Sequence, residues 1–153
     1  MLASLDAVEG ARVLDLFAGS GALGIEALSR GAATATFVDD DPRAVDAIRQ
    51  NLASLGLGSD RVAVVRDDAL RHAGRAAFAG LVLADPPYRF DRWVELFALL
   101  RGRAGLVVAE AGAEPDTGPG WETVKVKRYG GTVVVVVQPA AGSQDPAQQE
   151  GEC

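Results

Sequence analysis

Segments of apolar, β-prone residues alternate along the chain with segments that have helical spacing, and this alternation constrains the fold more than any other feature. The expected strands are 11–17, 33–39, 61–66, 80–84 and 105–111, and the expected helices between them are 22–31, one that begins at Pro42, 68–78 and 91–100. Strands that alternate with helices build a mostly parallel sheet with helices on both faces. The sequence therefore predicts a three-layer α/β fold, and 153 residues are enough for one domain with a sizeable core.

The C-terminal part follows a different pattern. Segments 121–129 and 132–139 are β-prone and flank Gly130-Gly131, which leaves no room for a helix between them. This arrangement predicts a β-hairpin, so we expect the last strand to be antiparallel to its partner. Residues 140–153 lack apolar periodicity and are expected to form a disordered tail behind a domain of residues 1–139.

The helix that begins at Pro42 has a clear start signal. Asp41 is the expected N-cap, and Pro42 occupies the first helical position, where proline is favoured. The apolar stripe of this helix is Val45, Ile48, Leu52 and Leu55. Gly31 is the expected C-cap of the preceding helix.

Composition excludes several classes of protein. His72 is the only histidine and the only cysteine is Cys153, so a histidine–cysteine metal site and an internal disulfide are not expected. The apolar runs are too short to span a bilayer, and the first residues lack the basic segment of a secretory signal. The net charge of -6 argues against a broad basic surface for nucleic acid. We expect a cytoplasmic protein that is a monomer.

A glycine-rich turn joins the first strand to the first helix. Gly19, Gly21 and Gly24 have the spacing of the dinucleotide-binding fingerprint, and Asp39 follows Gly19 by about 20 residues, as a ribose ligand would. Asp15 places a carboxylate beside the loop, which would repel a pyrophosphate but attract an ammonium group. This pattern favours S-adenosylmethionine over NAD, and 153 residues also leave no separate substrate domain.

The stretch D-P-P-Y follows the fourth strand, which lies beside the first strand in the usual doubly wound order. The Asp85 carboxylate and the Pro86 carbonyl would accept the two hydrogens of an exocyclic amine and aim its lone pair at a sulfonium methyl. The Pro86-Pro87 pair fixes the direction of that carbonyl, and Tyr88 offers a flat face for a base. A rigid turn with an aromatic plug is the structural alternative.

These motifs together resemble the bacterial 16S rRNA guanine-N2 methyltransferases of the RsmD type. The resemblance rests on "VLDLFAGSGALGIEALSRGA", "FVDDDPRAVDAIRQNL", "LVLADPPY" and the closing "GWETVKVKRYGGTVVVVV", over about residues 10–138. It implies a Rossmann-like class I methyltransferase fold, with a seven-stranded sheet whose last strand is antiparallel, and S-adenosylmethionine as the cofactor. The implied partner is 16S rRNA or a 30S assembly particle.

The resemblance also implies roles for individual residues. Asp85, Pro86, Pro87 and Tyr88 would hold the target amine and its base. Asp39 would bind the ribose and Asp68 the adenine, although a helix N-cap is an equal alternative for Asp68. The full set expected to bind the cofactor is Asp15, Phe17, Ala18, Gly19, Ser20, Gly21, Asp39, Asp40, Asp68, Ala69 and Asp85.

Members of that family usually carry a basic β-hairpin and a helix ahead of the glycine loop, whereas some ten residues precede the first strand here. The resemblance therefore implies a chain without this segment, which is expected to help bind RNA. Arg89 and Arg92 are candidate RNA contacts, and the basic residues of the C-terminal hairpin are interpreted as a solvated strand face. Three alternatives remain open: an adenine-N6 methyltransferase, a cofactor-binding remnant without activity, and an NAD-binding protein.

Overall fold

The computed structural model describes residues 2 and 5–142 of the chain. One seven-stranded sheet with the order β3-β2-β1-β4-β5-β7-β6 forms its centre. The strands are β1 (Arg12–Leu16), β2 (Thr34–Asp39), β3 (Val62–Arg66), β4 (Ala79–Ala84), β5 (Ala104–Ala111), β6 (Trp121–Tyr129) and β7 (Thr132–Pro139). The helices are α1 (Ala22–Ser29), α2 (Pro42–Ser54), α3 (Ala69–Ala73) and α4 (Trp93–Leu100).

The topology confirms the predicted fold class. Strands β1 to β5 pair in parallel, whereas β7 lies between β5 and β6 and is antiparallel to both. The order changes direction at β1 and β4, which are direct neighbours in the sheet. Loops that follow these two strands therefore open onto the same crevice, which is where open α/β sheets bind ligands.

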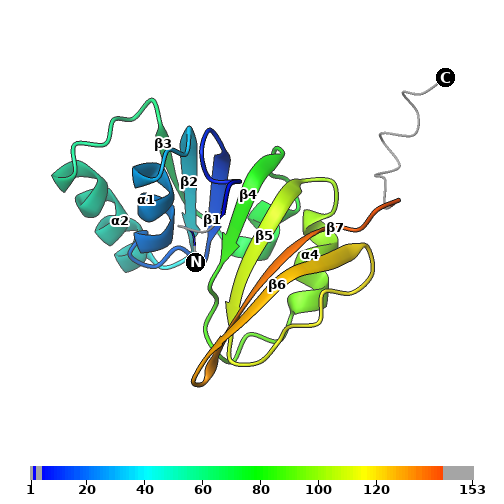
Figure 1. The fold of residues 1–153 in the computed structure, drawn as a ribbon. Coiled ribbons are helices and arrows are strands. Elements are labelled where there is room, and N and C mark those ends of the chain that lie inside the picture. The colour runs from blue at the N-terminus through cyan, green and yellow to red at the C-terminus, as the bar shows by residue number, and fades with distance from the viewer. Residues whose placement is uncertain (1, 3–4, 143–153) are drawn as a thin grey trace.

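Alternate residues of each central strand enter two separate apolar clusters. Val13 of β1 packs in the cluster that contains Phe37 and Ile48, whereas Leu14 packs in the cluster that contains Phe97. Figure 1 shows α1 and α2 beside β1–β3 and α4 behind β5 and β7. Side chains of a strand point alternately to opposite faces, so both faces of the sheet are apolar. A layer of helices covers each face.

Helix α2 begins as its sequence predicts but ends earlier than its apolar stripe. The Asp41 side chain accepts a hydrogen bond from the backbone N–H of Arg43, and Pro42 is the first helical residue. Val45, Ile48 and Leu52 are buried. The prediction for Leu55 was wrong, because this residue is the C-cap, turns away from the core and is 58% exposed.

The predicted helix over residues 68–78 was too long, because α3 covers only Ala69–Ala73. Gly74 ends it, since glycine has low helix propensity, and the chain must then extend to reach the start of β4 at Ala79. Asp68 is the N-cap of α3, and its carboxylate accepts from the backbone N–H of Arg71 at 2.9 Å.

Strands β6 and β7 form the predicted hairpin, with Gly130 in the left-handed region at a φ of 56°. Strand β7 is buried through its valines, whereas nearly all of β6 is exposed at the edge of the sheet. The exposed side chains of Lys125, Lys127 and Arg128 agree with a solvated strand face. Residues 143–153 of the expected tail lie outside the described residues.

Candidate functional site

The turn from β1 into α1 depends on residues with positive φ. Phe17, Gly19 and Gly21 have φ angles of 57°, 59° and 83°, and the backbone N–H of Gly21 donates to the Ala18 carbonyl at 2.8 Å. A bulky residue rarely adopts the conformation of Phe17. A Cβ added to Gly19 would meet nothing within 4 Å, so the loop backbone is open to a ligand on that side.

Asp39, at the end of β2, holds this loop in place. Its Oδ2 accepts from the backbone N–H of Gly19 and its Oδ1 from that of Asp41, both at 2.9 Å. The loop is also tied to α2, because the Asn51 side-chain amide donates to the Ser20 carbonyl at 2.9 Å. The carboxylate at the end of β2 and the glycine loop therefore form one preorganised unit.

Asp15 lies beneath the loop and is 1% exposed. Its Oδ2 accepts from the backbone N–H of Gly24 at 3.0 Å, in the first turns of α1. Burial raises the pKa of Asp15 to about 7; the Gly24 hydrogen bond opposes this shift, and the nearby carboxylates Asp85 and Asp39 add to it. The protonation state of this buried group thus depends on the charges around it.

This raised pKa predicts how stability depends on pH. Asp15 keeps its proton up to about pH 7 in the folded protein but loses it near pH 3.8 in the unfolded chain, so the folded state binds more protons between these values. The Asp15 contribution to the free energy of unfolding should therefore fall as the pH rises from 4 to 7, by at most about 1.4 kcal/mol per pH unit. Asp15→Asn should remove this slope, which urea unfolding at several pH values would measure. Identical pH profiles for the variant and the wild-type protein would contradict the assignment.

The D-P-P-Y stretch forms a compact turn directly after β4. Pro86 is buried, and the backbone N–H of Phe90 donates to the Pro87 carbonyl at 2.9 Å. No described residue donates a hydrogen bond to the Pro86 carbonyl. Phe90 packs edge-to-face on Phe17, with ring centroids 5.1 Å apart, which links this turn to the start of the glycine loop.

Tyr88 projects from that turn and is 78% exposed. Its hydroxyl lies 3.5 Å from Thr132 Oγ1, at the start of β7. A Cβ added to Gly112 would lie 3.3 Å from Tyr88 Cδ1, so the ring rests close against the chain that leaves β5. These contacts hold an otherwise exposed aromatic face beside the cavity.

The two turns enclose a cavity of about 440 Å³ at the carboxyl ends of the strands. It is lined by Phe17, Gly19, Asp39, Asp40, Asp85, Pro86, Pro87, Tyr88, Glu110 and Ala111. Every charged residue in this lining is acidic. Partial burial raises the pKa of Asp85. The cavity therefore suits a ligand that carries positive charge and hydrogen-bond donors.

Other predicted residues do not line this cavity. Ala18, Ser20 and Gly21 support the loop through backbone hydrogen bonds, and Asp15 lies beneath it. Ala69 is buried in α3. Asp68 caps α3 through Oδ1 and does not line the cavity, which agrees with the capping alternative.

The two candidate RNA contacts have different surroundings. Both nitrogens that Arg92 uses for pairing donate to the Glu95 carboxylate at 2.8 Å, so its charge is largely compensated. Arg89 is exposed immediately after Tyr88, outside the cavity lining. Among the described residues, Arg89 has no salt bridge, in contrast to Arg92.

Glu110 is the functional candidate that sequence reasoning missed. It lies near the end of β5, the strand that pairs with β4, and it lines the cavity with Asp85. Burial raises the pKa of Glu110, and the neighbouring Asp85 adds to the shift. Its signal was present in the sequence, because "VVAEA" places an acid at the carboxyl end of the strand next to D-P-P-Y.

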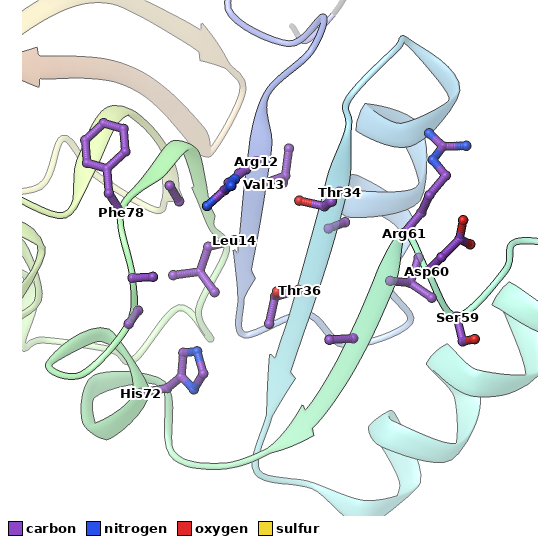
Figure 2. A pocket seen from close by; sticks show the side chains of 16 residues that line it. Arg12, Val13, Leu14, Thr34, Thr36, Ser59, Asp60, Arg61, His72 and Phe78 are labelled. Carbon is purple, nitrogen blue, oxygen red and sulfur yellow. The ribbon is translucent and has the colours of Figure 1, made fainter.

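A second cavity of about 480 Å³ lies elsewhere, toward the amino ends of the strands. Figure 2 shows Leu14 and Thr36 on adjacent strands of this cavity, with His72 and Phe78 along one side. It contains neither the glycine loop nor the D-P-P-Y turn. The predicted site motifs therefore converge on the acidic cavity.

Two further findings concern residues 2 and 5–142. No helix there is long and apolar enough to cross a membrane. Within the same residues, no group of three or more histidine, cysteine, aspartate or glutamate side chains is arranged to hold a metal ion.

Comparison with solved structures defines the class of protein. The yhhF protein of Escherichia coli matches with a TM-score of 0.78 and 32% identity over 88% of this chain and 78% of that one. SMU.776, in complex with SAH, matches in fold with a TM-score of 0.79 at 17% identity, over 90% of this chain and 47% of that one. The sheet order, the antiparallel β7 and these neighbours define a class I methyltransferase fold.

The family follows from the sequence match. The model of the family described as Conserved hypothetical protein 95 matches residues 1–138, and the chain belongs to this family, the RsmD family. YlbH of Bacillus subtilis (strain 168) is 39% identical over 141 residues, which cover 84% of this chain and 76% of YlbH.

Ribosomal RNA small subunit methyltransferase D of Escherichia coli (strain K12) is 41% identical over 97 residues, or 63% of this chain. The match spans 48% of that enzyme. The aligned part of the chain therefore corresponds to about half the length of this curated relative.

Proposed function

We propose that the protein transfers a methyl group from S-adenosylmethionine to the exocyclic N2 amine of a guanine in 16S rRNA. The family and the name of its Escherichia coli relative support an rRNA methyltransferase. The observation that carries the proposal is the acidic cavity shared by the glycine loop and the D-P-P-Y turn.

The charge of the cavity favours S-adenosylmethionine over NAD. S-adenosylmethionine carries a sulfonium and an ammonium group and has no phosphate. Asp39, Asp40, Asp85 and Glu110 would attract these cationic groups, whereas they would repel the pyrophosphate of NAD. The residues of the cavity therefore fit the methyl donor.

Individual residues fit parts of this cofactor. Asp39 lines the cavity and still has lone pairs for the ribose hydroxyls, because each of its oxygens accepts only one backbone N–H. The open side of Gly19 lets a ligand approach the backbone. Asp15 would act from beneath the loop, where its ionised form would attract the ammonium group. Bound there, the cofactor would supply the electrophilic methyl group.

The D-P-P-Y turn fits the acceptor. The Asp85 carboxylate and the unoccupied Pro86 carbonyl would accept the two hydrogens of the amine, which directs the nitrogen lone pair toward the methyl group. Tyr88 would stack on the base beside them. Catalysis would rest on positioning and electrostatics, without a covalent enzyme intermediate.

Two experiments test this function. Calorimetric titration with S-adenosylmethionine and, separately, NADH should show binding of the first alone; binding of NADH alone would overturn the proposal. Methyl transfer from labelled S-adenosylmethionine to under-methylated 30S particles and to naked 16S rRNA should place the label on guanine N2. Label on adenine N6 would favour the alternative acceptor, and cofactor binding without transfer to any RNA would favour a cofactor-binding remnant.

Asp39→Ala should weaken S-adenosylmethionine binding by about 10- to 100-fold, because hydrogen bonds to a charged group contribute about 1.5–3 kcal/mol. Calorimetry on the variant would measure the change. Asp46→Ala is a matched control, because this acid is exposed on α2 away from the cavity. Unchanged affinity in Asp39→Ala, with the fold intact by circular dichroism, would contradict the assigned role.

A further inference from the structure

Glu110 and Asp85 occupy equivalent positions on neighbouring strands. Ala84 of β4 is paired with Ala109 of β5 in a parallel register. Asp85 is the residue after Ala84, and Glu110 is the residue after Ala109. Adjacent strands lie about 4.8 Å apart, and both side chains line the same cavity. The two carboxylates therefore face one ligand from adjacent strands.

Within residues 2 and 5–142, no lysine or arginine forms a salt bridge with either member of this acidic pair, Asp85 and Glu110. Their mutual repulsion contributes to the raised pKa of Glu110. Glu110 is half-buried and Asp85 is exposed at the cavity, and two neighbouring carboxylates without a cation repel each other unless hydrogen-bond donors satisfy them. The arrangement thus favours a ligand that presents several donors along one edge.

Guanine presents such an edge, and adenine does not. On guanine the N2 amine adjoins the N1–H group, so three N–H donors lie side by side. On adenine the ring nitrogen beside the N6 amine is N1, which has no hydrogen and is an acceptor. An ionised carboxylate next to the amine-binding residues would therefore accept from guanine N1 but repel the lone pair of adenine N1.

We propose that Glu110 selects guanine, by accepting a hydrogen bond from the N1–H of the base whose N2 amine is held by Asp85 and the Pro86 carbonyl. This inference rests on the proposed function and adds a specificity-determining residue to it. Asp85 and Pro86 would accept the amine of guanine or of adenine. Glu110 would distinguish the N1–H donor of guanine from the N1 acceptor of adenine. A site that hydrogen-bonds a donor discriminates strongly against an analogue that lacks it.

The test compares two nucleotides that share the N2 amine. The probes are GMP and 2,6-diaminopurine riboside monophosphate, which has an acceptor at N1 and an amine in place of the oxygen on C6, so the Glu110 variant is needed to assign any preference to N1. Titration by NMR in the presence of S-adenosylhomocysteine measures binding without catalysis. The wild-type protein should bind GMP at least about tenfold more tightly, the effect of one hydrogen bond to a charged group. Glu110→Gln should abolish this preference, because its amide can also donate to the N1 acceptor.

Glu122→Gln is the matched control, since this glutamate is exposed on β6 outside the cavity lining, and it should keep the preference for GMP. Equal binding of the two nucleotides by the wild-type protein, or a preference that survives in Glu110→Gln, would overturn the inference. Methyl transfer to 16S rRNA is measured separately on the same proteins. A wild-type protein that prefers GMP through Glu110 but transfers no methyl group to RNA would count against the proposed function alone.

Discussion

Asp85→Asn should lower kcat for methyl transfer by about 10²–10³-fold, the usual effect of removing one preorganised electrostatic contact to a transition state. The asparagine amide keeps the size of the side chain but replaces a charged acceptor with a group that also donates. The amine of the base would then lose the partner that directs its lone pair. The affinity for S-adenosylmethionine, measured by calorimetry, should fall far less than kcat, because Asp39, Asp40 and Glu110 still supply negative charge to the cavity.

The control for this variant is Asp46→Asn, which makes the same chemical change on the exposed surface of α2. It should leave both kcat and cofactor affinity unchanged. If Asp85→Asn instead lost most of its cofactor affinity while bound complexes turned over normally, Asp85 would belong to cofactor binding and the assigned role in holding the amine would be wrong.

Gly24→Ala should destabilise the fold by about 1–3 kcal/mol, the usual cost of overpacking a core. An added Cβ would overlap the Phe37 ring and lie 3.0 Å from the buried carboxylate of Asp15. Neither neighbour has room to move, because both are fully buried. For a chain of this size we expect the melting temperature to fall by roughly 2–12 °C in a thermal unfolding experiment.

Gly131→Ala provides the comparison, since an added Cβ in the hairpin turn would meet nothing within 4 Å and this glycine has no positive φ. Its melting temperature should change little. A Gly24→Ala variant as stable as Gly131→Ala would show that the interface between α1 and β2 is loosely packed. The third glycine of the loop would then not be required for helix packing.

Local signals predicted most of the fold correctly. The start of α2 follows from Asp41 and Pro42 because capping depends only on neighbouring backbone groups. The hairpin follows from Gly130-Gly131 for the same reason. The prediction failed at Leu55, where the apolar period continued although the helix had ended and the chain had turned away from the core. Burial there depends on tertiary packing, which periodicity alone does not describe.

The site also combines features that local sequence determines with features that depend on tertiary packing. The sequence by itself determined the α/β class, the glycine loop and the D-P-P-Y turn, because these depend on short-range spacing and on the backbone preferences of glycine and proline. Only the tertiary structure placed Glu110 beside Asp85 and showed every charged residue of the cavity lining to be acidic. These features depend on which strands are neighbours in the sheet, and strand order brings together residues that are far apart in the chain.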